Sequence, residues 1–208
     1  MAIKAPALLL FDLGGVLLEN TAFDALTRLS SDDFDVAEFK ERWLTSPAVR
    51  RFELGRSAPP EFADAFLDEW RVALSRDEFL REFIAWPRGF YAGARELLAS
   101  LRRDFRIACL SNSNELHWAK FDGFEGVFDI ALSSHRLGVI KPDDDAFLRA
   151  LEICAVAPTD VLFFDDSLSN VRSAERLGLR AFHVDGVVQL RHVLAAHGLL
   201  QPSSRHEL

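Results

Sequence analysis

The apolar positions of the chain fall into short runs that alternate with segments of helical period. The runs are typical of strands buried on both faces, and they cover residues 8–11, 106–110, 128–132, 161–164 and 181–184. The later helical segments cover residues 94–103, 115–121, 144–153, 168–177 and 187–197. Because such alternation implies right-handed crossovers, the sequence predicts an α/β fold: a Rossmann-like parallel sheet with helices on both faces.

A different pattern occupies the segment after the first strand. Apolar and aromatic residues recur there at helical spacing, and we predict helices at residues 21–29, 36–44, 60–74 and 75–84, with no strand. Ser75 and Glu78 form a capping box, and residues 86–90 resemble a linker. We expect an α/β core of residues 1–18 and 87–208, and an all-helical domain of residues 19–86 that covers the first strand as a lid.

Composition and charge exclude several classes of protein. Hydrophobic residues make up 49% of the chain and charged residues 27%, a soluble globular balance. A formal net charge of −8 argues against nucleic-acid binding, and no apolar stretch is long enough to span a membrane. Because no signal peptide is recognisable and the two cysteines lie in apolar patterns, we expect a cytoplasmic protein.

Polar side chains follow three of the predicted strands. Asp12 ends the first, Ser111 and Asn112 follow the second, and Asp165 and Asp166 end another. Taken singly, each could be a turn or helix-capping residue. The carboxyl ends of parallel strands meet at one edge of a sheet, so we expect these side chains to form one site.

The expected site has the residues that phosphoryl transfer needs. Asp12, Asp166 and a backbone carbonyl of the Gly14–Gly15 turn would offer oxygen ligands to Mg²⁺. Lys141 lies in a loop before a helix and could equally be a solvated loop lysine. If it joins the site, it would keep Asp12 ionised for attack on phosphorus, and Ser111 and the Asn112 backbone would hold the phosphate.

These residues resemble the four ordered motifs of the haloacid dehalogenase superfamily. The motifs are Phe11-Asp12-Leu13-Gly14-Gly15-Val16, Leu110-Ser111-Asn112, Lys141-Pro142 and Phe164-Asp165-Asp166. The helical insertion resembles the C1-type cap of that superfamily. The residues around the second and fourth motifs are most similar to the sugar-phosphatase branch typified by bacterial α-D-glucose-1-phosphatase, near the amino-terminal phosphatase domain of soluble epoxide hydrolases.

The resemblance implies a Mg²⁺-dependent phosphomonoester hydrolase that acts on a small phosphorylated metabolite as a monomer or homodimer. It implies that Asp12 is the nucleophile and that Asp12, Asp166 and the Gly14 carbonyl hold the metal. The residues expected to contact phosphate or substrate are Ser111, Asn112, Lys141, Gly15 and His117. Asp165 and Asn170 would support the residues that make these contacts.

One departure from the family pattern concerns Gly14. Most phosphatases of this superfamily carry a second aspartate there, which protonates the leaving group. Such help is typically worth about 10²–10⁴-fold in rate. We therefore expect a substrate with an acidic leaving group, such as a sugar 1-phosphate, with a metal-bound water or His117 in place of the missing acid.

Two other functions stay open. A metal-independent 2-haloacid dehalogenase also lacks the second aspartate, and a non-catalytic protein could keep the pocket for binding or regulation. Phosphonate hydrolysis in this superfamily needs a lysine from the cap, and Lys40 lies in an ordinary helix pattern.

Substrate contacts are expected from the helical domain, where the polar or aromatic candidates are Trp43, Arg50, Arg51 and Glu53, although packing or surface exposure is the commoner role for such residues.

Overall fold

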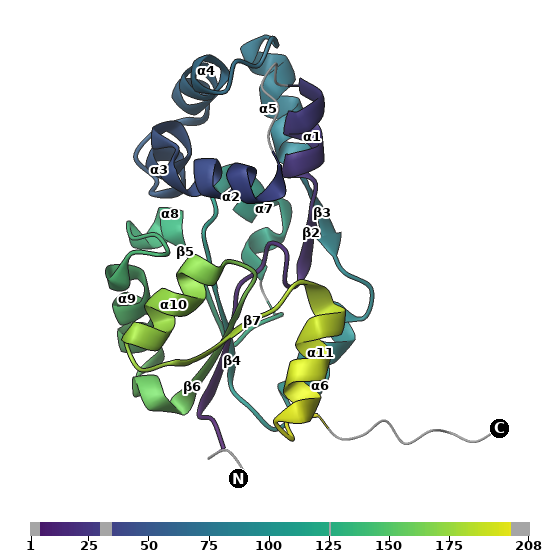
Figure 1. Ribbon diagram of the computed structural model, residues 1–208, viewed down its shortest axis with the longest axis vertical. Coiled ribbons are helices and arrows are strands. Elements are labelled where there is room, and N and C mark those ends of the chain that lie inside the picture. The colour runs from purple at the N-terminus through teal and green to yellow at the C-terminus, as the bar shows by residue number, and fades with distance from the viewer. Residues whose placement is uncertain (1–4, 30–34, 125, 201–208) are drawn as a thin grey trace, which may run out of the picture.

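The computed structural model describes residues 5–29, 35–124 and 126–200, and its central feature is a parallel sheet (Figure 1). The strands are β1 (Leu8–Phe11), β4 (Ile107–Ser111), β5 (Ile130–Ser133), β6 (Val161–Asp165) and β7 (Arg180–His183), in the order β5-β4-β1-β6-β7. Every neighbouring pair in this sheet is parallel. The predicted α/β, Rossmann-like fold is confirmed. Strand β1 lies at the centre, between the strands that carry the second and fourth motifs.

Helices cover both faces of the sheet. One face packs against α6 (Ala94–Leu101) and α11 (Gly186–Ala196), and the other against α9 (Asp144–Cys154) and α10 (Leu168–Arg176). Successive side chains of a strand point to opposite faces, so Leu9 and Phe11 enter one apolar core while Leu8 and Leu10 enter the other. This two-sided burial explains why β1 is continuously apolar. The remaining short elements of the sheet region are α7 (Glu115–Lys120), η1 (Asp122–Phe124), α8 (Ser134–Leu137) and η2 (Pro158–Asp160).

A block of helices lies beyond the carboxyl edge of the sheet and is called the helical block below (Figure 1). It consists of α1 (Ala22–Leu29), α2 (Val36–Thr45), α3 (Pro47–Glu53), α4 (Pro59–Glu69) and α5 (Arg76–Ala85). Its core is aromatic: the Phe52 and Phe62 rings stack with centroids 4.2 Å apart, and Trp70 and Trp86 are fully buried. Helix α4 ends at Glu69, before the predicted residue 74, and Arg71 then takes a positive φ of 51°.

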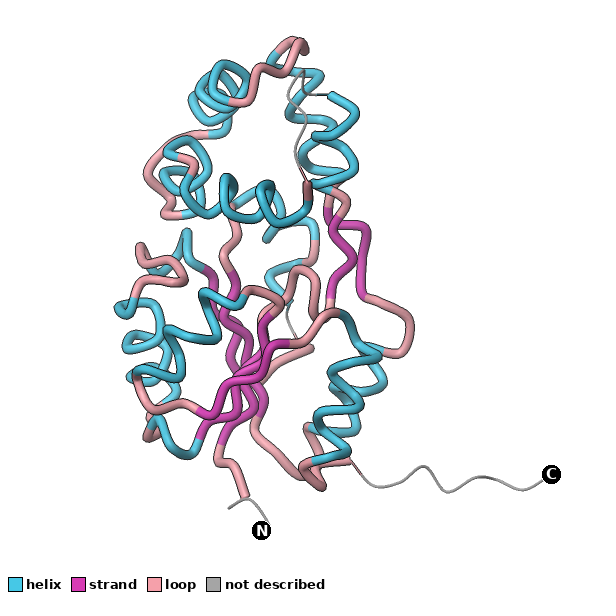
Figure 2. Tube along the Cα trace, viewed as in Figure 1, coloured by secondary structure: helices cyan, strands magenta, loops and turns pink. Residues whose placement is uncertain are grey.

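Two short antiparallel strands join the helical block to the sheet (Figure 2). They are β2 (Leu18–Asn20) and β3 (Pro87–Phe90), which pair Leu18 with Phe90. The prediction that residues 86–90 form only a linker was therefore wrong. The two strands are only three and four residues long, so neither shows the alternation of apolar and polar residues that predicts a strand. No helix in the described ranges combines the length and apolar character that crossing a bilayer requires.

Candidate active site

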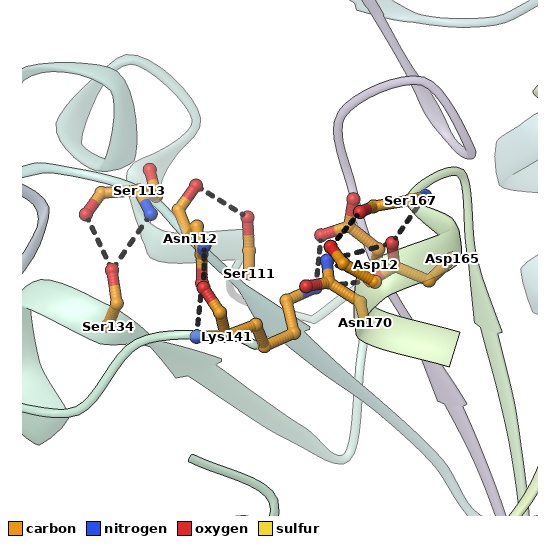
Figure 3. A network of polar contacts seen from close by, with 10 residues as sticks. Asp12, Ser111, Asn112, Ser113, Ser134, Lys141, Asp165, Ser167 and Asn170 are labelled. Carbon is orange, nitrogen blue, oxygen red and sulfur yellow. Dashed lines mark hydrogen bonds and ion pairs between the residues drawn. The ribbon is translucent and has the colours of Figure 1, made fainter. Parts of the chain in front are cut away.

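Three carboxylates meet at the carboxyl edge of the sheet, and Figure 3 shows two of them, Asp12 and Asp165, beside Lys141. Asp12 follows β1, and its backbone N–H donates to the Phe164 carbonyl at 2.8 Å, which fixes the end of β1 against β6. Asp165 is the last residue of β6 and Asp166 follows it. One carboxylate oxygen from each of Asp12, Asp165 and Asp166 lies within 4.8 Å of the other two. The parallel register thus brings together the acids of the first and fourth motifs.

Lys141 neutralises part of this negative charge from within the protein. Its side chain is 1% exposed, and Nζ lies 2.8 Å from Asp12 Oδ1 and 2.7 Å from Asp165 Oδ2. Burial alone would lower the pKa of Lys141, but the two aspartates outweigh it, so its pKa is raised and the ammonium group stays charged. The cis peptide bond between Lys141 and Pro142 is part of the loop that carries this side chain.

Asn112 holds the loop that presents Lys141. Its Nδ2 donates to the Lys141 carbonyl at 2.8 Å, and its Oδ1 accepts from the Lys141 backbone N–H at 2.9 Å. Both polar atoms of the Asn112 side chain therefore hold this loop. Ser111 ends β4 and is 4% exposed. It lines a smaller neighbouring cavity of about 50 Å³ together with Gly14.

Asp165 supports the site and has little capacity left for a ligand. Besides Lys141, its carboxylate accepts from Asn170 Nδ2 at 2.9 and 3.0 Å and from the Ser167 backbone N–H at 2.8 Å. These donors fix the orientation of Asp165, which is fully buried. Of these three carboxylates, only Asp12 and Asp166 line the larger cavity described below.

Of Gly14 and Gly15, only one occupies a position whose backbone conformation and surroundings require glycine. Gly15 has a φ of +74°, and a Cβ atom there would lie 2.6 Å from Asp166 Oδ2. Glycine is therefore needed at residue 15. Gly14 shows no positive φ, and a Cβ there would find Asn20 Nδ2 at 3.8 Å as its nearest neighbour. The missing aspartate at residue 14 is thus not excluded by the shape of the turn.

A cavity of about 370 Å³ separates these residues from the helical block. Its floor contains Asp12, Lys141 and Asp166, and its lining from the helical block is largely apolar. The residues that the helical block contributes include Phe23, Phe39, Lys40, Trp43, Leu44 and Glu53. This volume suits a small metabolite.

His117 borders the cavity, but both of its ring nitrogens are occupied. Nε2 lies 2.7 Å from the Phe83 carbonyl, and Nδ1 lies 3.2 Å from Asn114 Nδ2. The carbonyl can only accept, so Nε2 carries the proton and Nδ1 accepts from Asn114. Burial lowers the pKa of His117 to about 4, so the ring is neutral. It also stacks on the Phe83 ring at 4.2 Å, and it links α7 to α5.

Two residues of the helical block reach the site although their sequence patterns are ordinary. Lys40 Nζ from α2 lies 2.5 Å from Asp166 Oδ2. Glu53, the last residue of α3, is only 6% exposed and lines the cavity. Glu53 is among the candidates for substrate contact that the sequence offers. For Lys40 the helical period does not show which face of α2 meets the sheet.

Comparisons with known proteins agree with this geometry. A model of the haloacid dehalogenase-like hydrolase family matches residues 6–178. The chain is 29% identical over 205 residues to Phosphatase MT3486 of Mycobacterium tuberculosis, covering 92% of this chain and 91% of that protein. It is 24% identical over 198 residues to D-ribitol-5-phosphate phosphatase of Bacteroides thetaiotaomicron, covering 89% and 95%. A crystal structure of a Bacteroides thetaiotaomicron enzyme of the same family, in complex with magnesium and inorganic phosphate, superposes with a TM-score of 0.69 at 22% identity, covering 86% of this chain and 94% of that one.

Proposed function

The chain belongs to the haloacid dehalogenase-like hydrolase family, and from that premise we propose that it is a Mg²⁺-dependent phosphatase of small metabolites. The observation that carries the proposal is the cluster of Asp12, Asp165 and Asp166 with Lys141, from which Asp12, Asp166 and Lys141 line the cavity beside the helical block. The relatives named as phosphatases support the same reaction class.

In this proposal Asp12 is the nucleophile. A carboxylate oxygen of Asp12 attacks phosphorus, the bond from phosphorus to the leaving oxygen breaks, and an aspartyl-phosphate forms. Water then attacks the same phosphorus and releases Asp12 and inorganic phosphate. Lys141 orients Asp12 through their 2.8 Å contact, and Ser111, the Asn112 backbone and Gly15 are proposed to hold phosphate oxygens. His117 borders the space for the organic part of the substrate.

The donor set of the site fits a divalent cation. Burial raises the pKa of Asp12 to about 7, and the neighbouring carboxylates Asp165 and Asp166 add to this while Lys141 opposes it. Among the described residues, the three carboxylates outnumber the two ammonium groups that contact them, those of Lys141 and Lys40. Hard oxygen donors of this kind are what Mg²⁺ prefers. We propose that Asp12, Asp166 and the Gly14 carbonyl hold the ion. When bound, it would supply positive charge that offsets the repulsion between the carboxylates and the phosphate.

We further propose that residues 1–18 and 87–208 form the core domain and that residues 19–86 form a cap over it. The position of the helical block above the sheet edge and its share of the cavity lining support this division. The boundary would run through the ribbon of β2 and β3, since one strand enters the helical block and the other leaves it.

The substrate class proposed first is a sugar 1-phosphate. Its basis is the absence of a carboxyl group at residue 14, because an anomeric leaving group needs less protonation than a simple alcohol and so tolerates a proton donor that acts from elsewhere in the cavity. A comparison of turnover on α-D-glucose 1-phosphate and glycerol 3-phosphate tests this finer proposal. Equal or faster turnover of glycerol 3-phosphate would reject it without affecting the phosphatase proposal.

The phosphatase proposal is tested with p-nitrophenyl phosphate and Mg²⁺. We expect hydrolysis that stops on adding EDTA and in an Asp12→Asn variant. Halide release from a 2-haloacid without metal would instead identify a dehalogenase. Inactivity across a broad panel of phosphate esters would favour a binding or regulatory protein.

A further inference from the structure

We propose that Glu53 is the general acid of this phosphatase and supplies the proton that no side chain at Gly14 can give. The inference rests on the function proposed above, and it concerns the leaving-group oxygen of the substrate. Asp12 attacks phosphorus from the sheet, so the leaving group departs on the opposite side, toward the helical block. Glu53 lines the cavity from that block.

Contacts on both sides of Glu53 fix its position over the sheet edge. Arg50, one turn earlier on α3, forms an ion pair of 2.7 Å with Asp143, which lies two residues after Lys141. Beyond the end of α3, Gly55 passes so close to α8 that a Cβ atom would lie 2.5 Å from the His135 carbonyl oxygen. Helix α3 is thus held against the loop that carries Lys141, and Glu53 is held at the cavity.

The surroundings of Glu53 favour its protonated form. Burial raises the pKa of Glu53 to about 8, the hydrogen bond from Trp43 opposes this, and Asp12 adds to the rise. The cations Lys141 and Arg50 lower the pKa of Glu53, but not by enough to cancel the rise. A protonated carboxyl can accept from the Trp43 indole N–H and still donate its own O–H. Near neutral pH, Glu53 therefore holds a proton in a cavity whose floor is an attacking carboxylate.

Two neighbouring cavity residues are less suited to this task. His117 is neutral, and its single ring proton is donated to the Phe83 carbonyl. Lys40 is paired with Asp166 at 2.5 Å, and its pKa is raised despite the lowering effect of burial, so it holds its proton tightly. An efficient general acid has a pKa near the working pH, a condition that Glu53 meets.

The proton balance of the two steps is complete with Glu53 and one water. As the Asp12 oxygen bonds to phosphorus and the bond to the leaving oxygen breaks, that oxygen takes the Glu53 proton and departs as an alcohol. Glu53 is then a carboxylate beside the vacated position. The incoming water gives one proton to Glu53 and its oxygen to phosphorus, and the bond from phosphorus to Asp12 breaks to return the carboxylate and phosphate.

The test compares leaving groups through kcat/KM, which reports only the steps up to the first irreversible phosphoryl transfer. Wild type, Glu53→Gln and a control, Glu41→Gln, are assayed on p-nitrophenyl phosphate and glycerol 3-phosphate. Glu41 is exposed on α2 and does not line the cavity, so it controls for the same substitution made away from the site. We expect Glu53→Gln to lose about 10²-fold or more on glycerol 3-phosphate. Since p-nitrophenolate needs no proton to leave, Glu53→Gln should lose only a few-fold in kcat/KM on p-nitrophenyl phosphate. Glu41→Gln should match wild type on both substrates.

Equal losses of Glu53→Gln on the two substrates, or no loss on either, would overturn the proposal. The pH dependence gives a second readout on wild type alone. We expect kcat/KM for glycerol 3-phosphate to fall above a pH of about 8, with no matching fall for p-nitrophenyl phosphate. The same alkaline fall for both substrates would also overturn it. Failure of the phosphatase proposal itself would look different, because wild type would then hydrolyse neither ester.

Discussion

Replacing Lys141 by Met tests whether the charge balance of the site also stabilises the fold. Methionine has a similar length but no charge, so the substitution keeps most of the packing around the side chain. It removes the ammonium group that lies 2.8 Å from Asp12 and 2.7 Å from Asp165. Asp165 is fully buried and would keep only the neutral donors of Asn170 and Ser167.

The expected loss is large because the carboxylates would stay buried without their cation. Removing one partner of a buried ion pair typically costs about 3–5 kcal/mol in the free energy of unfolding. That is a large share of the total, which for most domains is about 5–15 kcal/mol. The contact of Lys141 with two aspartates places it in the upper part of this range. Part of the loss should return on acidification, since burial raises the pKa of Asp12 and its protonation removes one of the unpaired charges.

Urea unfolding in the presence of EDTA measures this loss without a bound cation. The matched control is Arg149→Met, which breaks the exposed pair of Arg149 with Glu152 and should change the free energy of unfolding by less than about 1 kcal/mol. Adding Asp165→Asn to Lys141→Met should recover part of the loss. A Lys141→Met protein within about 1 kcal/mol of wild type would refute the reasoning, because the carboxylates would then not depend on Lys141.

Further predictions concern the turn, the metal and the helical block. Gly15→Ala should cost about 1–2 kcal/mol of stability, because φ is positive there and the added Cβ atom would lie 2.6 Å from Asp166 Oδ2. Gly14→Ala should change the stability by no more than about 0.5 kcal/mol. Equal effects of the two substitutions in thermal melts would contradict this difference between the glycines. Lys40→Gln removes the ammonium group that Mg²⁺ must displace from Asp166, so the Mg²⁺ concentration for half-maximal activity should fall about 2- to 5-fold; a rise would show that Lys40 aids metal binding instead. For Glu53, the raised pKa contributes stability that is fully present at acidic pH and is lost as the pH rises toward about 8. The stability of wild type relative to Glu53→Gln should therefore fall by about 1.4 kcal/mol per pH unit between about pH 5 and 8, and a flat difference in urea unfolding across that range would argue against the buried, protonated state.

The central part of the fold could be predicted because its signals are local. Leu8 to Phe11 is apolar at every position, which a strand needs when helices cover both faces of the sheet. Parallel strands place their carboxyl ends at one edge, so Asp12 and Asp165 had to approach each other once both strands were recognised. Lys141 could be placed in the predicted site through the resemblance to a known family. Its position in a loop does not show where its side chain points.

Other features follow from contacts between distant segments, which local pattern does not encode. The ribbon of β2 and β3 pairs residues about 70 positions apart, and neither strand is long enough to show a period of two. The turn after Asp12 requires glycine only at residue 15, and the sequence does not show this because the approach of Asp166 depends on how β6 lies against β1. The occupied ring nitrogens of His117 depend likewise on the packing of α7 against α5.

The sequence by itself determined the sheet, its apolar strands and the acids at their ends, because strand periodicity and chain direction are properties of neighbouring residues. Only the tertiary structure decided which residues of the helical block face those acids. Helical period shows which side of a helix is buried but not what it is buried against. That choice came from contacts such as Arg50 with Asp143, and it placed Lys40 at Asp166 and Glu53 in the cavity above Asp12.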